Sequence, residues 1–335
     1  MFTKVIPFLA CPACRADLSL KDAIMRGDRV ESGALHCSGC QEIYPIAGFV
    51  PRFAKNLEEV KDKTAKSFGF KWKKFSTIDP AYKQNFLDEL APLDYRTFFK
   101  GKTVLDAGTG IGIPSLCLAE NGAKAVFGAD ISTQIESAYE NTKGQSEVTI
   151  TQADIYHLPF RKASFDVVLC VAVLQHLPNP AKAFTELLSY VKPGGNIIIW
   201  VYGKEGNAFV EYAVEPMRKA LTTKIPLPGL LGVSYLFGAA FEVAAQFVYK
   251  PLNRIGVRGL PLQHYIVYRS QFDFRMNTHM IFDQLLAPLS YLFKREEVEN
   301  FMRAPEIDNY QLRHHLENSW TAIGQTKMTS SAAPN

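Results

Sequence analysis

VLDAGTGIG, residues 104–112, is a short apolar run that ends at Asp106 and then places three glycines among the next six residues. A strand, a glycine-rich turn and a helix N-terminus together present backbone N–H groups to a ligand, and missing side chains let that ligand approach the main chain closely. The stretch therefore predicts a strand, a ligand-binding turn and a helix that starts near Pro114.

Apolar runs and helical patterns alternate on the C-terminal side of this turn, up to residue 202. After the first strand, further strands are expected at residues 125–130, 148–154, 165–174 and 196–203, and helices at residues 113–122, 133–144 and 180–191. Ser132 and Asn179 are expected to cap the second and third helices, and the turn KPGG, residues 192–195, to precede the last strand. Near-continuous apolar strands indicate a sheet covered on both faces, so the sequence predicts an α/β fold with a doubly wound, mostly parallel sheet.

The glycine turn alone does not define its ligand. Dinucleotide dehydrogenases use nearly the same device, followed about 20 residues later by an acidic residue that binds the ribose. Asp130, at the end of the second expected strand, fits either kind of protein.

Four motifs in a fixed order carry a more specific resemblance. They are VLDAGTGIG, Asp154 after the third strand, LPFRKASFDVVLCVAVLQHLPNP (158–180) through the fourth, and KPGG before the fifth. This set resembles the class I S-adenosylmethionine-dependent methyltransferases over residues 101–202, and residues 291–325 resemble them more weakly. The resemblance implies a Rossmann-like methyltransferase domain.

The resemblance also implies a cofactor site. In the family, Asp106 and the backbone of Gly108 and Gly110 would face the methionine part of S-adenosylmethionine, Asp130 would bind both ribose hydroxyls, Asp154 the adenine amino group, and Ile131 and Ile155 the ring faces. Each aspartate could instead cap a helix or a turn.

Methyl transfer from a sulfonium is an in-line displacement, so positioning supplies much of the catalysis and a base is needed only for some acceptors. His176, in the loop after the fourth strand, is the best-placed candidate base by topology. A histidine that stabilises this turn or lines the cofactor pocket is the alternative. His264, Tyr265 and His279 are further candidates.

Two C-x-x-C pairs, Cys11 with Cys14 and Cys37 with Cys40, supply four thiolates that can close a tetrahedral structural Zn²⁺ site. The 22 residues between the pairs slightly exceed the usual spacing of about 15–20. Iron in a rubredoxin-like site and a redox dithiol are the alternatives. With the following YPIAGFVPRF, residues 44–53, this segment resembles the small zinc-ribbon proteins that partner tRNA methyltransferases. Cys117 and Cys170 are expected to be core residues.

Composition bounds the class of protein. The 335 residues are 47% apolar and 21% charged, which excludes a disordered chain, and the net charge of +4 is too small to require a nucleic-acid partner. Paired cysteines indicate a reducing compartment, and the apolar run before Cys11 is too short for a signal peptide, so a cytoplasmic protein is expected. No signal for an oligomeric state is visible.

Changes in composition and sequence pattern along the chain indicate its domain organisation. We expect a zinc ribbon at 1–53, a linking helical segment over the cofactor cleft at 54–100, a methyltransferase domain at 101–325 with a substrate-side insertion at 203–290, and a disordered tail at 326–335. The lysines and aromatics of residues 61–75 fit a linking helix, or alternatively a nucleic-acid surface.

The insertion bears on the methyl acceptor. Residues 225–241 contain no charge, but they fall short of the roughly 20 apolar residues of a membrane span. A buried or lid helix is one interpretation, and peripheral membrane contact through residues 225–258, which would admit a lipid-like acceptor, is the other. The sequence therefore favours a methyltransferase for a small or amphiphilic metabolite over one for tRNA or rRNA and over a non-catalytic cofactor-binding partner protein.

Overall fold

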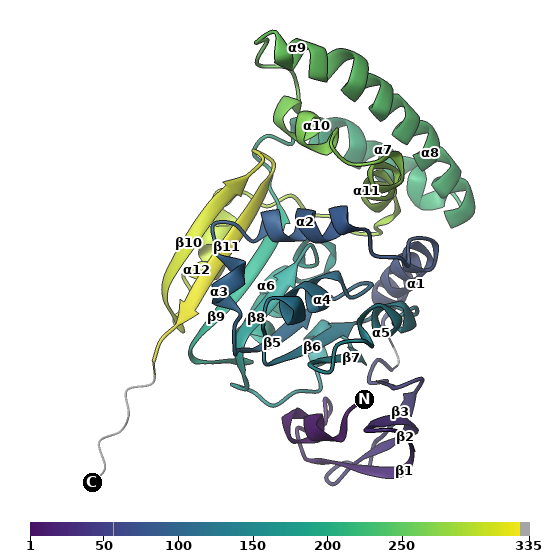
Figure 1. The fold of residues 1–335 in the computed structure, drawn as a ribbon, viewed down its shortest axis with the longest axis vertical. Helices are drawn as coiled ribbons and strands as arrows, with labels where there is room; N and C mark the ends of the chain where they lie inside the picture. The colour runs from purple at the N-terminus through teal and green to yellow at the C-terminus, as the bar shows by residue number, and fades with distance from the viewer. Residues whose placement is uncertain (56, 329–335) are drawn as a thin grey trace.

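The computed structural model describes residues 1–55 and 57–328 and contains two sheets (Figure 1). The larger sheet has seven strands in the order β10-β11-β9-β8-β5-β6-β7, of which β5 to β9 are parallel and β10 and β11 are antiparallel. Its strands are β5 (Thr103–Ala107), β6 (Ala125–Asp130), β7 (Val148–Gln152), β8 (Phe165–Val171), β9 (Val191–Tyr202), β10 (Ile307–His315) and β11 (Ser319–Thr326). The predicted α/β fold with a mostly parallel sheet is confirmed.

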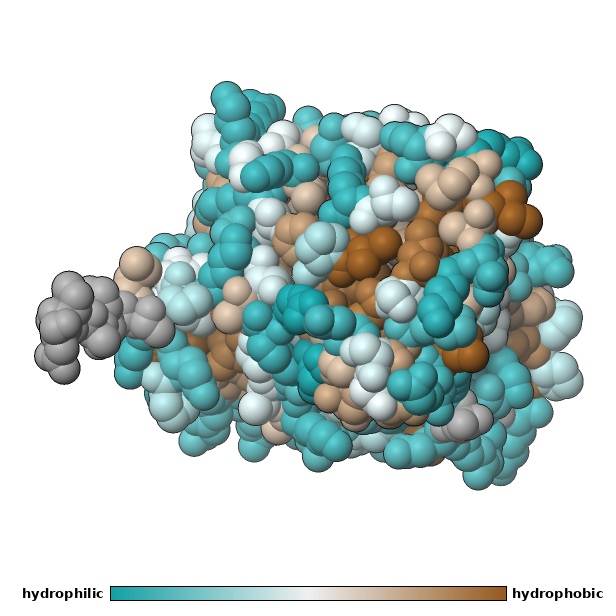
Figure 2. All heavy atoms as spheres, turned by 90° about the horizontal axis from the view of Figure 1, so that it is seen from below, coloured by the Kyte–Doolittle hydropathy of each residue, from teal (hydrophilic) through white to brown (hydrophobic). Residues whose placement is uncertain are grey.

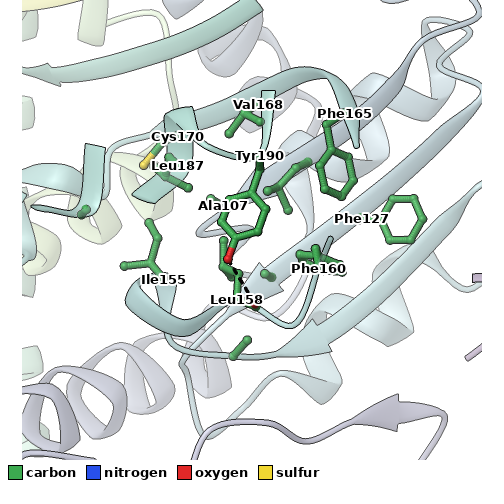
Figure 3. Close-up of a cluster of buried hydrophobic side chains, with 14 of the residues drawn as sticks. Ala107, Phe127, Ile155, Leu158, Phe160, Phe165, Val168, Cys170, Leu187 and Tyr190 are labelled. Carbon is green, nitrogen blue, oxygen red and sulfur yellow. Dashed lines mark hydrogen bonds between the residues drawn. The ribbon is translucent and has the colours of Figure 1, made fainter. Parts of the chain in front are cut away.

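Helices cover both faces of this sheet, as a doubly wound fold requires. One face packs against α6 (Pro180–Leu188) and α12 (Arg295–Met302), and the other against α4 (Ile113–Glu120) and α5 (Glu136–Thr142). Figure 3 shows part of the core on the α6 face, where Phe127, Phe160, Phe165 and Cys170 are buried and the Tyr190 hydroxyl donates to the carbonyl of Leu158. Cys117 is buried as well, so both cysteines predicted to lie in the core do so.

The local signals for helix and strand ends are confirmed in part. Asn179 caps α6, because its side chain accepts the N–H of Lys182. Ser132 caps only a turn, since its hydroxyl accepts the N–H of Gln134 and α5 begins later, at Glu136. KPGG is not a turn before β9 but a bulge inside it: Phe165 pairs with Val191 and Val167 with Asn196, so extra residues of β9 loop out between the two pairs.

The smaller sheet is antiparallel and consists of β1 (Leu18–Arg26), β2 (Arg29–Cys37), β3 (Ile43–Ala47) and β4 (Val50–Pro51). It lies beside β7, and a bridge between Arg52 and Gln152 continues the larger sheet past its edge strand. The ring of Phe8 lies 4.9 Å from that of Phe127, and both units contribute to one hydrophobic core. The end of the molecule that carries this sheet is largely hydrophilic, with hydrophobic residues gathered near its middle (Figure 2).

Three helices connect the two units: α1 (Glu59–Lys74), α2 (Pro80–Glu89) and α3 (Tyr95–Phe98). Helix α1 turns its aromatic residues inward, and Phe75 is buried with Phe282 of the insertion. The predicted tail at 326–335 lies mainly outside the described residues, although Thr326 ends β11 and the N–H of Lys327 donates to Glu306.

The insertion forms a separate helical layer beyond the C-terminal ends of the parallel strands (Figure 1). It contains α7 (Glu215–Ala220), α8 (Leu227–Ala244), α9 (Lys250–Arg254), α10 (Gln263–Arg269) and α11 (Phe274–Leu286). A π-helical segment, Ala245–Tyr249, joins α8 to α9, which makes one helix of 28 residues, Leu227–Arg254. By length and composition this helix could cross a membrane, and only 17% of its 18-residue apolar stretch is buried inside the protein. The expectation that the apolar stretch is too short for a membrane span is therefore corrected.

Candidate functional site

A cavity lies at the C-terminal ends of β5, β6 and β7, where open α/β sheets bind their ligands. It contains about 520 Å³ of empty space, part of it open to solvent. Its lining includes Lys61, Thr64, Ala107, Gly108, Ala129, Asp130, Ile131, Ala153, Asp154, Ile155, Tyr156, Leu158, Val173, His176, Leu177 and Pro178. Six of the eight residues predicted for the cofactor and for catalysis therefore meet in one place, namely Gly108, Asp130, Ile131, Asp154, Ile155 and His176.

The glycine turn is closely packed on both sides. A Cβ atom on Gly108 would lie 2.1 Å from Val173, and its φ of +98° also favours glycine. A Cβ on Gly110, where φ is +57°, would lie 2.8 Å from the Trp72 ring of α1. Gly110 itself does not line the cavity, because α1 covers it and its N–H donates to the carboxylate of Asp130 at 2.9 Å.

Asp130 is held at the end of β6 by two backbone donors, one for each carboxylate oxygen. The N–H of Ser132 donates to Oδ1 at 2.7 Å, and the N–H of Gly110 donates to Oδ2. Burial raises the pKa of Asp130 above its ordinary value, against the effect of these two donors and of nearby Lys71. Since a carboxylate has about four acceptor positions, capacity remains for the two hydroxyls of a ribose.

Asp154 follows β7 and caps the short turn Ile155–His157 by accepting the N–H of Tyr156 at 3.1 Å. Its other oxygen lies 2.9 Å from the ammonium of Lys61 in α1. Asp154 therefore caps a turn, as the sequence allowed, and also lies on the cavity wall.

Asp106 differs from the other two carboxylates because it does not line the cavity. It is buried, and its carboxylate accepts the hydroxyl of Ser115 from α4 at 2.7 Å. Burial raises its pKa to about 6. In this position Asp106 fastens the glycine turn to α4, and direct contact with the cofactor stays a prediction.

His176 is buried on the cavity wall with a defined orientation. Its Nδ1 lies 2.8 Å from the carbonyl oxygen of Leu289, which can only accept, so Nδ1 carries the proton and Nε2 keeps a lone pair. Burial lowers the pKa of His176, so the ring is neutral near pH 7. The rings of Phe68 and Tyr202 lie 5.3 and 5.8 Å away. This tautomer is the one a general base needs.

The sequence missed a buried ion pair beside His176. The ammonium of Lys71 in α1 lies 2.5 Å from the carboxylate of Asp283 in α11, and the hydroxyl of Tyr202 donates to the same carboxylate at 3.3 Å. Lys71 lies among aromatic residues on the inward side of α1, and this position was the only indication in the sequence that its ammonium is buried. Asp283 sits within an ordinary amphipathic helix and had no comparable signal.

The other histidine and tyrosine candidates are dispersed. His264 is exposed, Tyr265 lines a second cavity, and His279 is buried with neither ring nitrogen hydrogen-bonded within the described chain. Burial places the pKa of His279 well below its ordinary value.

The second cavity lies between the insertion, α2 and the β9–β11–β10 side of the sheet, and contains about 1650 Å³ of empty space, part of it open to solvent. Tyr202 at the end of β9 lines this cavity, whereas His176 lines the first, so these two neighbouring rings lie between the two spaces.

The four paired cysteines come together as predicted. Their sulfur atoms all lie within 4.8 Å of one another, with Cys11 to Cys40 at 3.6 Å and Cys14 to Cys37 at 3.3 Å. Sulfur atoms around a tetrahedral Zn²⁺ lie about 3.8 Å apart, given Zn–S bonds of about 2.3 Å. The cluster therefore fits a structural zinc ion.

The sheet order, the glycine turn after β5 and the carboxylates after β6 and β7 define the class I S-adenosylmethionine-dependent methyltransferase fold. Residues 105–199 match the family model described as a methyltransferase domain, and residues 3–47 match the one described as a Trm112p-like protein. The chain therefore combines a methyltransferase domain of this class with an N-terminal Trm112p-like zinc ribbon.

Curated relatives match about a third of the chain. Phosphoethanolamine N-methyltransferase 2 of Caenorhabditis elegans is 34% identical over 112 residues, which are 32% of this chain and 25% of the relative. The ubiquinone biosynthesis O-methyltransferase of Paraburkholderia phytofirmans is 38% identical over 132 residues, which are 37% of this chain and 55% of the relative. The chain thus spans a quarter to about half of these relatives. Among solved structures, magnesium protoporphyrin IX methyltransferase from Synechocystis PCC 6803 aligns with a TM-score of 0.46 and 14% identity, covering 82% of this chain and 100% of that one.

Proposed function

We propose that this protein transfers a methyl group from S-adenosylmethionine to a small or amphiphilic metabolite. The observation that carries the proposal is the convergence of Gly108, Asp130 and Asp154 on the cavity at the strand ends, with a second, apolar cavity beside it. The names of the similar proteins, which concern phosphoethanolamine and ubiquinone biosynthesis, support an acceptor of this kind.

Bound S-adenosylmethionine supplies an electrophilic methyl group on a positively charged sulfur. Asp130 would hold the ribose, Asp154 the adenine, and the backbone at Gly108 the methionine part, while Ile131 and Ile155 would contact the ring faces. Helix α1, within the linking segment 54–100, would exclude water, because Trp72 covers the glycine turn and Lys61 reaches Asp154.

His176 is proposed as the general base where the acceptor carries a proton. Its Nε2 lone pair is fixed by the hydrogen bond of Nδ1 to Leu289, and its ring adjoins Tyr202 on the wall of the acceptor side. Asp283 is ionised beside it: burial, the largest single influence, raises the pKa of Asp283, but the combined effects of the Lys71 ammonium and of the neighbouring His176 and His279 lower it by more. A protonated His176 would be stabilised by this carboxylate.

We also propose a cytoplasmic protein that contacts membranes peripherally. On the helix Leu227–Arg254 and at Ile255 directly after it, four apolar side chains are 58–77% exposed, namely Leu236, Val243, Phe247 and Ile255. Glu242, the acidic residue of this helix, is turned inward and bound by Asn277. An apolar outward stripe that ends near exposed cations at Arg254 and Arg258 suits the surface of an anionic bilayer.

An RNA acceptor is less well supported. The aromatics of residues 61–75 pack inward, and two of the four exposed lysines of this segment, Lys63 and Lys66, pair with acidic residues of their own helix. Stacking on bases requires accessible aromatic rings.

The test has two steps. S-adenosylmethionine is titrated into the purified protein by calorimetry, and formation of S-adenosylhomocysteine is then followed with separated metabolite and RNA fractions from cells that lack the gene. Turnover on a metabolite fraction that His176→Gln abolishes, with cofactor binding kept, is expected. Turnover on RNA alone would replace the metabolite proposal, and binding without turnover on any fraction would favour a non-catalytic partner protein.

A further inference from the structure

We propose that the second cavity binds an anionic amphiphile, with its carboxylate-like head beside Arg269 and Trp200 and its apolar tail among the helices of the insertion. This inference rests on the proposed function, in which the ligand is the methyl acceptor. It names the chemical class of that acceptor.

The walls formed by the insertion are apolar and aromatic. Phe237 and Phe241 come from α8, Ile266 from α10, and Met280 and Ile281 from α11. These side chains offer a long hydrophobic surface with few groups that could hydrogen-bond. An alkyl or isoprenoid tail gains free energy here for each methylene removed from water.

Polar groups gather where the cavity meets the sheet. Trp200 and Tyr202 lie two residues apart on β9 and share one face, and across the sheet Tyr202 pairs with Ser319, which pairs with His315. Trp200 and His315 are only 6% and 5% exposed, yet Nε1 of Trp200 and Nδ1 of His315 have no hydrogen-bond partner within the described chain. A buried polar atom without a partner is costly, so these two atoms indicate a ligand group.

Arg269, at the end of α10, supplies a charge to the same cavity. Its side chain is 2% exposed, and its nitrogens make only long hydrogen bonds, 3.3 Å to Asn85 and 3.5 Å to the carbonyl of Met276. No carboxylate among the described residues lies in ion-pair contact with it. A buried guanidinium in this condition is stabilised by an anion that can accept its hydrogen bonds.

The nearest acidic candidate does not neutralise this charge. Glu89 lines the cavity and accepts a hydrogen bond from Asn85, and burial raises its pKa to about 8. Near pH 7 Glu89 is therefore mainly a hydrogen-bond donor. The N–H groups of Trp200 and Arg269 and a protonated Glu89 form a donor-rich wall, which matches an acceptor-rich head such as a carboxylate.

The experiment measures binding of decanoate, hexanoate and decanol to the full chain by calorimetry at pH 7. Decanoate should bind at least about tenfold more tightly than decanol because of its charge. It should also exceed hexanoate by about threefold to fourfold for each added methylene. Equal affinity for decanoate and decanol, or no dependence on tail length, would overturn the proposal.

Variants locate the site. Ala213→Phe fills the cavity and should abolish decanoate binding, whereas Ala239→Phe, at an exposed position of α8 outside the cavity lining, should leave it unchanged. Trp200→Phe should weaken decanoate by about threefold to tenfold, the effect of one lost hydrogen bond. Decanoate binding to Ala213→Phe at the level of the unmodified protein would contradict the assignment.

S-adenosylmethionine affinity is measured in the same variants. If the unmodified protein does not bind S-adenosylmethionine, the proposed function is contradicted. If it binds S-adenosylmethionine but not decanoate, only the proposed class of acceptor is contradicted.

Discussion

Lys71 and Asp283, 212 residues apart in the sequence, form a buried ion pair that ties α1 to α11. Lys71 also lies 4.0 Å from the centre of the Trp72 ring, which covers Gly110. The pair therefore connects the helix over the cofactor cavity with the insertion that forms the acceptor cavity.

Removing one partner of this pair should destabilise the protein strongly. Lys71→Met leaves the Asp283 carboxylate buried without its ammonium, and Asp283→Leu leaves the ammonium buried alone, so each should cost about 3–5 kcal/mol of unfolding free energy. The double variant replaces both charges by apolar groups and should recover much of this loss. Urea unfolding of the four proteins measures the coupling, and additive losses in the double variant would contradict a direct interaction.

Glu89 should make the protein less stable as the pH rises. Burial raises the pKa of its carboxyl from 4.5 to about 8, so between these values the folded state holds a proton that the unfolded state has released. Stability that is present below pH 4.5 is therefore lost progressively towards pH 8. Glu89→Gln, which keeps an acceptor for Asn85, should flatten this part of the profile and be more stable than the unmodified protein at pH 8, by roughly 2–4 kcal/mol.

Chemical denaturation at a series of pH values between 4.5 and 8.5 checks this prediction. Glu186→Gln serves as the control, because the pKa of Glu186 is lowered by contacts with Lys162 and Tyr190, so its removal should not flatten the same range. Parallel profiles for Glu89→Gln and the unmodified protein would show that Glu89 is ionised in the folded state.

Zinc should stabilise both units of the chain. Because the ribbon pairs with the edge of the larger sheet at Gln152 and shares its core, loss of the metal should expose apolar surface of the methyltransferase domain as well. We expect one zinc per chain by atomic emission, lost in Cys14→Ala and kept in Cys117→Ala, whose cysteine lies in the core of the other domain. An unchanged melting temperature after chelation of the metal would contradict a structural role.

The sequence was informative where function depends on local chain geometry. The glycine turn, the carboxylates at strand ends and the C-x-x-C pairs lie at positions set by a few neighbouring residues, and the structure brings Asp130, Asp154 and His176 to one cavity. Asp106 shows the limit of such motifs, since its direction depends on a hydroxyl of α4.

Features formed by distant segments were not predictable in the same way. Asp283 lies in an ordinary amphipathic helix, and only the packing of α11 against α1 gives it a partner. Likewise, the length of the helix Leu227–Arg254 depends on a π-helical segment that continues it past Ala244. The uncharged run at residues 225–241 did not indicate this continuation.

The outward stripe of α8 should bind anionic vesicles. Flotation with vesicles of phosphatidylcholine that contain about 30% phosphatidylglycerol should recover the protein, and pure phosphatidylcholine should recover much less, because the cations near the end of the helix contribute. Leu236→Glu and Phe247→Glu should each lower binding about tenfold or more. Ile24→Glu, at an exposed position of the zinc ribbon, is the control. Absence of vesicle binding would contradict this prediction. A dimer in sedimentation that Phe247→Glu dissociates would show that a second copy of the chain covers this stripe.

Asp130 provides the most direct test of the cofactor site. Its carboxylate receives N–H groups from Gly110 and Ser132 and borders the cavity, so Asp130→Ala removes both the proposed ribose contact and a support of the glycine turn. Asp130→Asn keeps the size and one acceptor oxygen, and should weaken S-adenosylmethionine by about tenfold to a hundredfold, as expected for loss of a charged hydrogen-bonding partner. Glu136→Gln, at the start of the next helix outside the cavity lining, should leave the affinity unchanged. Calorimetric titration with a melting curve for each variant separates binding from folding, and a well-folded Asp130→Asn protein with the original affinity would place the ribose elsewhere.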